Sequence, residues 1–199
     1  MTYVIAEIGV NHNNNIKISK KIIDFCVKEK VNAVKFQTFN TENLALKKTP
    51  KASYQLRSKN DTESHFEMLK KLELSKADHK NLIKYCKKKG IDFISTPYDI
   101  ESAKFLHEEL NVPYFKTASA DIVDIPLHKY ISSTLKPCLI STGMSSLSEI
   151  DQVYQIYKKK KIAFLHCISN YPCSDESLNL NVIKGLGNIF DVPIGFSDH

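Results

Sequence analysis

The 199-residue sequence is 42% hydrophobic and 25% charged, which is the composition of an ordinary globular chain with one sizeable core. Its apolar runs are far too short to span a bilayer, and its N-terminus has no basic segment before the apolar residues, so neither a membrane protein nor a secreted one is expected. The net charge of +6 comes without aromatic interleaving or a nucleic-acid motif, so an anionic small substrate is expected rather than a nucleic acid.

The cysteines indicate the redox state of the chain, and the two lysine runs indicate where helices end. Five cysteines stand at irregular spacing with no C-x-x-C pair, so we expect reduced thiols in a cytoplasmic protein. The runs "CKKKG" and "YKKKKI" fall at predicted helix ends, where cations complement the helix dipole. Both runs are therefore interpreted as solvated helix termini.

The first half of the chain alternates short β-branched runs with amphipathic stretches, which is typical of βα units around a parallel sheet. Strands are expected at 3–9, 32–39 and 92–99. The first helix, at 16–30, has Ile18, Ile22, Phe25 and Cys26 on its predicted apolar face. A long polar segment at 40–60 precedes further helices at 64–74, 76–90 and 100–110.

The second half continues the same alternation. Strands are expected at 113–119, 137–143, 162–167 and 193–198, and helices at 125–134, 145–160 and 178–190. Pro126 falls in the first turn of its helix, where proline is tolerated. Ser146 and Glu149 have the spacing of a capping box at the start of the next helix.

Seven strands in one βα series favour a barrel over a doubly wound sheet. A doubly wound sheet usually shows a G-x-G-x-x-G loop after its first strand, and "GVNHNNN" is not one. A (β/α)₈ barrel normally needs about 250 residues. We therefore expect residues 1–199 to form an incomplete (β/α)₈ TIM-type barrel, truncated after about seven strands.

Polar residues stand at or near the exit of every predicted strand, which is where a parallel barrel carries its active site. Lys35 and Lys116 are the most informative, because an ammonium pointing into a closed barrel needs an anion to offset its burial. An outward-facing lysine is the alternative for each. With the hydroxyls of Thr96, Ser119, Ser141 and Ser197, the two lysines would suit a phosphate and a carboxylate.

Glu7 stands among apolar residues in the first strand, so its carboxylate is either paired with a lysine or used as a base. The histidines give weaker evidence for a metal site. His199 and Asp198 offer at most two ligands at one strand end, and His166 is as consistent with a core histidine as with a ligand. Spacing alone predicts no metal site.

Seven motifs follow one another at these strand ends: "AEIGVNHN", "VKFQTF", "STPYD", "FKTAS", "ISTGM", "LHC…YP" and "GFSDH". Over essentially its whole length the chain resembles the N-acetylneuraminate (sialic acid) synthase family, which includes legionaminic and pseudaminic acid synthases. The resemblance implies a (β/α)₈ barrel followed by an antifreeze-like domain, in a domain-swapped homodimer. It also implies condensation of phosphoenolpyruvate with N-acetylmannosamine or a related N-acetylated hexosamine, using Mn²⁺ or Mg²⁺ and releasing phosphate.

The resemblance assigns roles residue by residue. It implies that Glu7 handles protons and that His199 is the first of two metal-binding histidines. Its phosphoenolpyruvate contacts fall on Lys35, Thr96, Lys116, Ser119, Ser141, Gly143 and Ser197. Its sugar contacts fall on Gln37, Asp121, Ser169 and Tyr171.

The sequence departs from the family pattern at three places. Asp121 stands where the family commonly has a glutamate, and Ser169 where many members have asparagine. The second metal histidine, a later sugar-binding aspartate, the eighth strand and the C-terminal antifreeze-like domain are absent from the 199 residues. We therefore expect this chain alone to be inactive, and the alternatives are a legionaminate or pseudaminate synthase or a non-catalytic fragment of such an enzyme.

Overall fold

The structure, a computed structural model, describes residues 2–56, 58, 62–158 and 160–199. The chain divides into two compact units, Met1–Val112 and Pro113–His199. Each unit contains one parallel sheet with its own helices.

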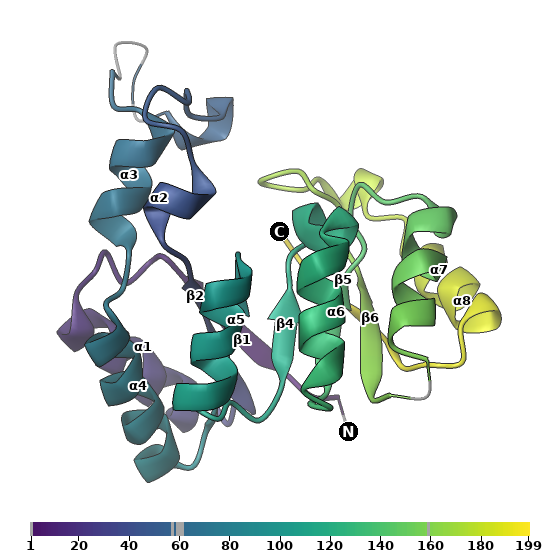
Figure 1. The fold of residues 1–199 in the computed structure, drawn as a ribbon, viewed down its shortest axis with the longest axis horizontal. Coiled ribbons are helices and arrows are strands. Elements are labelled where there is room, and N and C mark those ends of the chain that lie inside the picture. The colour runs from purple at the N-terminus through teal and green to yellow at the C-terminus, as the bar shows by residue number, and fades with distance from the viewer. Residues whose placement is uncertain (1, 57, 59–61, 159) are drawn as a thin grey trace. The chain divides into compact units, whose positions relative to one another are not determined.

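The first unit is a three-stranded parallel sheet, ordered β1 (Ile5–Gly9), β2 (Ala33–Thr38) and β3 (Asp92–Pro97) (Figure 1). Helices α1 (Ile16–Lys28) and α4 (Lys76–Lys89) pack against each other. Helix α5 (Ile100–Lys104) follows β3 and continues as a π-helical turn, Phe105–Glu109. The core is aromatic, since Phe36 and Phe93 stack with centroids 5.3 Å apart and the α4 residue His79 meets Phe93 edge-on.

The polar segment at 40–60 contains structure that its composition did not indicate, namely the short helix α2 (Thr41–Leu44) and a 3₁₀ turn at Ser53–Gln55. The helix predicted at 64–74 is confirmed as α3 (His65–Leu72). Glu73 accepts hydrogen bonds from both the backbone and the hydroxyl of Thr41, which ties the start of α2 to the end of α3.

The apolar face predicted for the first helix is confirmed at Cys26, which is buried, but is wrong at Ile18 and Phe25. Phe25 is 62% exposed and Ile18 is 37% exposed, while the buried positions are Ser19, Ile23 and Cys26. These three residues have the i, i+4, i+7 spacing of one helical stripe, so the helix turns this neighbouring row inward.

The second unit is a four-stranded parallel sheet in the order β4 (Phe115–Thr117), β5 (Cys138–Ser141), β6 (Ile162–His166) and β7 (Ile194–Phe196). Helices α6 (Ile125–Ser133), α7 (Leu147–Ile156) and α8 (Asn181–Ile189) accompany these strands (Figure 1). Phe164 from β6 packs edge-on against Phe190, and His128 packs against Tyr157. These contacts give the unit its own core.

The seven predicted strands are therefore confirmed, and the fold is α/β with parallel sheets. The strands divide between the three-stranded and the four-stranded sheet among the described residues. The capping box is confirmed as well, since Ser146 and Glu149 bond reciprocally at the start of α7.

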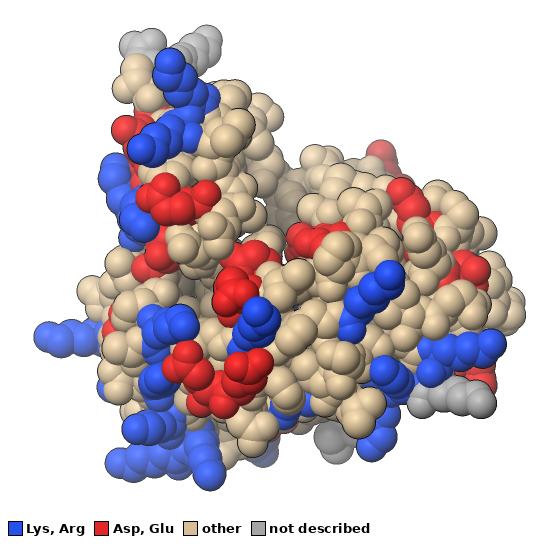
Figure 2. Space-filling model, viewed as in Figure 1, with Lys and Arg blue, Asp and Glu red and all other residues tan. Residues whose placement is uncertain are grey.

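The prediction that the "CKKKG" run lies at a helix end is confirmed at the C-terminus of α4. Its last turn holds Lys87, Lys88 and Lys89, and Gly90 closes it with a left-handed φ of 72°. Figure 2 shows lysines gathered over the region where Figure 1 places α1 and α4. In the other lysine run α7 ends at Ile156, and residue 159 lies outside the described residues. Within the described parts of the chain, no helix has the length and apolar character needed to cross a membrane.

Candidate functional site

In the first unit, the predicted site residues share one face of the sheet. Strand register places Glu7 beside Lys35, and Gln37 beside Thr96. Side chains alternate along a strand, so Lys35 and Gln37 point away from Phe36, which belongs to the aromatic core next to α4. The outward-facing alternative for Lys35 is therefore not what the structure shows.

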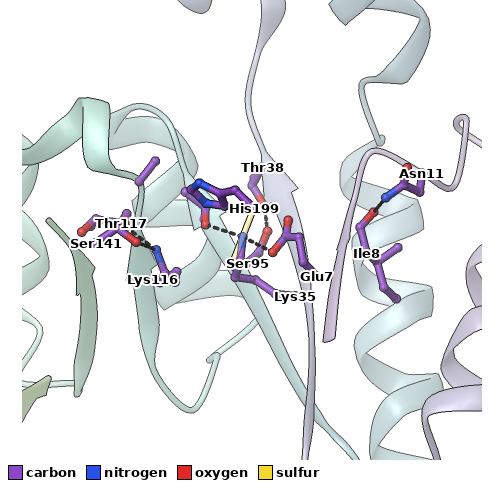
Figure 3. A network of polar contacts seen from close by, with 12 residues as sticks. Glu7, Ile8, Asn11, Lys35, Thr38, Ser95, Lys116, Thr117, Ser141 and His199 are labelled. Atoms are coloured by element: carbon purple, nitrogen blue, oxygen red, sulfur yellow. Dashed lines mark hydrogen bonds and ion pairs between the residues drawn. The ribbon is translucent and has the colours of Figure 1, made fainter. Parts of the chain in front are cut away.

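Lys35 is ion-paired at this face. Its Nζ lies 2.6 Å from Glu7 Oε2 and donates to Thr96 Oγ1 at 3.2 Å. Figure 3 shows the Glu7 carboxylate beside the Lys35 side chain. The Lys35 side chain is 14% exposed and the Glu7 side chain 47% exposed, so the carboxylate is the more accessible partner. Of the two sequence alternatives for Glu7, pairing with a lysine is the one that the structure displays.

Gly9 shapes the same region and was missed at the sequence level. It has a φ of +54°, and the β1–β2 register shifts between Glu7 and Gly9. A Cβ at this position would lie 2.9 Å from Glu7 Oε1 and 3.7 Å from Gln37 Nε2. A glycine at the end of β1 therefore lets the Glu7 carboxylate fold back beside Gln37, and its place two residues after Glu7 was the available signal.

In the second unit, Lys116 is the most buried of the predicted charged groups. The residue is 6% exposed, and its Nζ donates to the Thr117 carbonyl at 2.7 Å and to the Ser141 hydroxyl (Figure 3). These two contacts fix where the ammonium lies at the exits of β4 and β5. The structure thus brings Lys116 and Ser141 together, as the sequence predicted for an anion site.

A second cluster in this unit gathers two more predicted residues, Ser119 and Ser169, around the predicted Gly143. The Gly143 backbone N–H donates to Ser119 Oγ at 3.0 Å. A Cβ on Gly143 would lie 2.6 Å from Ser169 Oγ and 2.9 Å from both Ser119 Oγ and Cys167 Sγ. Cys167 is the residue that sequence reasoning missed here, although it stands in the "LHC" motif at the exit of β6.

Asp121 lies in the 3₁₀ turn Ser119–Val123 that follows β4, and its Oδ2 accepts from the Ala118 backbone N–H at 3.3 Å. Burial raises the pKa of Asp121 to about 6. The Ala118 hydrogen bond and the Lys116 ammonium act in the opposite direction, while Asp124 adds to the increase. A carboxyl group with a pKa near neutrality can accept or donate a proton at physiological pH.

His199 is held by the segment after β6. Its Nδ1 lies 2.6 Å from the Ile168 carbonyl, which can only accept, so Nδ1 carries a proton and donates it to this carbonyl. Nε2 lies 3.2 Å from Tyr171 Oη, and the two rings stack with centroids 4.2 Å apart.

This arrangement suits a metal-binding imidazole, because ligating histidines usually donate the other ring N–H to a carbonyl or carboxylate. The residues that the structure describes contain no group of three or more His, Cys, Asp or Glu side chains that could hold a metal ion. His199 therefore supplies one oriented nitrogen, and these residues do not by themselves form a metal site.

Two further strand-end residues, His166 and Ser197, make hydrogen bonds to backbone carbonyls. His166 is buried with Nε2 2.7 Å from the Leu178 carbonyl, which makes it a hydrogen-bonded core histidine. Ser197 donates its backbone N–H to the His166 carbonyl at 2.8 Å, so the residue after β7 lies beside the exit of β6.

Each unit thus gathers polar groups at the exits of its strands. The first unit offers a paired lysine and carboxylate with an amide and a hydroxyl. The second offers a buried ammonium, a serine–glycine cluster, a carboxyl group with a raised pKa and an oriented imidazole. Ammonium, hydroxyl and backbone N–H groups bind anions, and a carboxyl group with a pKa near neutrality transfers protons.

Comparison with known proteins gives consistent relatives. The NeuB family profile matches residues 22–199. The chain is 38% identical to the N,N'-diacetyllegionaminic acid synthase of Campylobacter jejuni, over 100% of this chain and 60% of that protein. It is 34% identical to the human N-acetylneuraminate-9-phosphate synthase, over 99% of this chain and 55% of that protein. The chain therefore spans little more than half the length of these relatives.

A solved structure agrees. The N-acetylneuraminic acid (sialic acid) synthetase from Leptospira borgpetersenii, in complex with citrate, superposes with a TM-score of 0.87 at 32% identity. The match covers 99% of this chain and 65% of that chain.

Proposed function

Because the chain belongs to the NeuB family, and its matching relatives include nonulosonic acid synthases, we propose that it condenses phosphoenolpyruvate with an N-acetylated hexosamine. The products would be a nonulosonic acid and inorganic phosphate. N-acetylmannosamine is the first substrate to test, and the substrates of legionaminate and pseudaminate synthases are the alternatives. The proposal includes the closed (β/α)₈ barrel and the homodimer that the family resemblance implies.

The observation that carries the proposal is the environment of Lys116. Its ammonium is buried at the exits of two strands, and the Thr117 carbonyl and the Ser141 hydroxyl orient it. An ammonium in such a site attracts an anion more strongly than one in water, because the surroundings screen the interaction less. Phosphoenolpyruvate carries both a phosphate and a carboxylate, which suits the ammonium groups of Lys116 and Lys35 together with the hydroxyls at the strand ends.

The anion contacts are completed by groups that donate hydrogen bonds. Thr96, Ser119, Ser141 and Ser197 would donate hydroxyls, and Gly143 would let the substrate approach the backbone closely. Gln37, Asp121, Ser169 and Tyr171 would contact the sugar. Asp121 is one methylene shorter than the glutamate common in the family, and Ser169 replaces a common asparagine, so these two positions are the natural candidates for setting sugar preference.

In the reaction, the enol carbon of phosphoenolpyruvate would attack the aldehyde carbon of the open-chain sugar. Water would add to the resulting cationic carbon, and phosphate would leave by C–O cleavage. Glu7 would transfer the proton to or from the water or the aldehyde oxygen, since its carboxylate is the exposed partner of the Lys35 pair. Mn²⁺ or Mg²⁺ would take His199 Nε2 as one ligand and, when bound, polarise the aldehyde.

Two measurements test the proposal. Calorimetric titration of the 199-residue chain with phosphoenolpyruvate tests the anion site directly, with D-lactate as a monoanionic control. The second measurement is phosphate release from phosphoenolpyruvate, with Mn²⁺ or Mg²⁺ and a panel of mono- and diacetamido hexoses. It tests turnover and is made both on the 199-residue chain and on the protein expressed from its whole gene.

We expect saturable phosphoenolpyruvate binding by the 199-residue chain but no turnover by this chain alone. Turnover with one sugar class of the panel is expected from a form that also carries the remainder of the barrel and the C-terminal domain. Absence of phosphoenolpyruvate binding would contradict the proposed anion site. Binding without turnover of any sugar by that longer form would favour the non-catalytic alternative.

A further inference from the structure

Cys167 lies immediately after β6 and has no part in the function proposed above. The residue is 2% exposed, and its Sγ lies 3.1 Å from Ser119 Oγ. Ser119 is one of the residues proposed to donate to phosphoenolpyruvate. The thiol is therefore in direct contact with a substrate-binding hydroxyl.

The hydrogen-bonding capacity of Ser119 decides what this contact does. A serine hydroxyl has one hydrogen to donate and two lone pairs to accept with. The Gly143 backbone N–H donates to Ser119 Oγ at 3.0 Å and occupies one lone pair. The Cys167 contact uses either the second lone pair, with the thiol donating, or the hydroxyl hydrogen, with sulfur accepting.

Sulfur is a weak acceptor, and an anionic oxygen is a far stronger one. With an anion bound, the hydroxyl hydrogen of Ser119 turns to that anion, and the thiol hydrogen fills the remaining lone pair. Ser119 then accepts from Gly143 and Cys167 and donates to the substrate, so that all three of its positions are used.

We infer that Cys167 is a positioning residue of the proposed active site, which orients the Ser119 hydroxyl for donation to phosphoenolpyruvate. This inference rests on the proposed function for the identity of the anion.

The packing around Gly143 supports this role. A Cβ on Gly143 would approach Ser119 Oγ, Cys167 Sγ and Ser169 Oγ to 2.9 Å or less, so these polar atoms converge on one small space in front of the glycine. Contacts this close restrict the rotation of Ser119, because moving its hydroxyl would bring it against neighbouring atoms. Cys167 thus fixes Ser119 by packing as well as by hydrogen bonding.

The test compares Cys167→Ala, which removes the donor, with Cys167→Ser, which keeps one. Cys173→Ala is the matched control, since the Cys173 thiol contacts the Ser174 carbonyl rather than Ser119. The first readout needs no substrate: amide hydrogen exchange at Gly143, compared with exchange at Ile140 in the core of β5. The second readout is phosphoenolpyruvate affinity by calorimetry.

In Cys167→Ala we expect exchange at Gly143 to accelerate about 10-fold relative to Ile140, because the acceptor Ser119 can rotate away. Phosphoenolpyruvate affinity should fall about 5- to 10-fold, the usual effect of losing one oriented hydrogen bond. Cys167→Ser should restore both values to within about 2-fold, and Cys173→Ala should change neither.

Equal acceleration at Gly143 and Ile140 would show a general loss of stability and overturn the inference. The inference would also fail if Cys167→Ser were as impaired as Cys167→Ala. If the unaltered chain does not bind phosphoenolpyruvate, the proposed function fails, while the Gly143 exchange data still decide whether Cys167 positions Ser119.

Discussion

The two units hold their site lysines differently. In the first unit, Lys35 lies 2.6 Å from a carboxylate oxygen of Glu7, so its charge is offset by a neighbour on the adjacent strand. In the second unit, the more deeply buried ammonium of Lys116 is oriented by the Thr117 carbonyl and the Ser141 hydroxyl. A charge interacts more strongly with a bound anion where burial reduces screening, so the two lysines are not equivalent as anion-binding groups.

This difference suggests that the two units have different roles in the proposed reaction. The first unit would supply the proton-transferring group, since Glu7 is the accessible member of its pair. The second unit would supply most of the binding energy for phosphoenolpyruvate. Substitutions made separately in each unit distinguish these two roles.

The largest effect is expected from Glu7→Gln. Loss of the proton-transferring carboxylate should reduce turnover about 10²- to 10⁴-fold. Phosphoenolpyruvate binding should not weaken, because the charge of Lys35 is no longer offset by Glu7. Phosphate release and calorimetry measure the two quantities. The control is Glu101→Gln, which removes the exposed partner of Lys104 in the same unit. Turnover within a few-fold of the unaltered protein would show that Glu7 only pairs with Lys35.

The second prediction concerns Lys116→Met, which removes the charge and keeps a similar length. Phosphoenolpyruvate affinity should fall about 30- to 1000-fold, corresponding to the loss of a buried charge-assisted contact worth about 2–4 kcal/mol. Lys35→Met should cost less affinity, about 10-fold, since Glu7 already offsets that charge. The exposed Lys129→Met on α6 serves as the control.

Equal losses of affinity in Lys35→Met and Lys116→Met would contradict the proposal that the second unit supplies most of the binding energy for phosphoenolpyruvate. Unchanged affinity in Lys116→Met would remove the observation on which the proposed function depends.

The third prediction follows from the raised pKa of Asp121, about 6 compared with an ordinary 3.8. Between these values the folded state holds a proton that the unfolded state has lost, so the stability contributed by this group falls as pH rises from about 4 to about 6. At neutral pH the buried charge destabilises the fold. Asp121→Asn should therefore raise the free energy of unfolding at pH 7.5 by about 1–3 kcal/mol.

The pH dependence of that gain provides the check. Denaturant unfolding at pH 3.5 should show little difference between the two proteins, because Asp121 is then largely protonated in both states. Asp191→Asn, an exposed aspartate in the same unit, controls for net charge. A gain of equal size at both pH values would show that burial of the charged form is not its cause.

The sequence predicted the elements well for a physical reason. Parallel strands buried by helices produce short β-branched runs, and amphipathic helices produce a period of 3.6, so each repeat is visible locally. The apolar face of α1 was assigned wrongly at Ile18 and Phe25, because these two residues form an equally apolar row beside the buried one. Which row turns inward depends on packing with α4, and that contact is not local in sequence.

The site residues were predicted as a set but not in their pairing. Strand-end positions identify Lys35 and Lys116 as equivalent groups, while the difference between them arises from register, which places Glu7 opposite Lys35. Gly9 and Cys167 were missed for the same reason. The role of Gly9 depends on a register shift, and that of Cys167 on a contact with Ser119, which lies 48 positions earlier in the chain.

The smallest expected effects come from the hydroxyl partners of the two lysines, and they test the comparison most directly. Ser141→Ala removes a hydroxyl that accepts from Lys116, while Thr96→Val removes the one that accepts from Lys35 at 3.2 Å. The ammonium of Lys116 would be less well oriented without Ser141, so phosphoenolpyruvate affinity should fall about 5- to 10-fold. Lys35 would keep its contact with Glu7, so Thr96→Val should weaken binding only about 2- to 3-fold.

Calorimetry on both variants measures the ratio of the two losses of affinity, with Ser133→Ala on α6 as a control for loss of an exposed hydroxyl. A larger loss in Thr96→Val than in Ser141→Ala would reverse the assignment and make the first unit the principal anion-binding region.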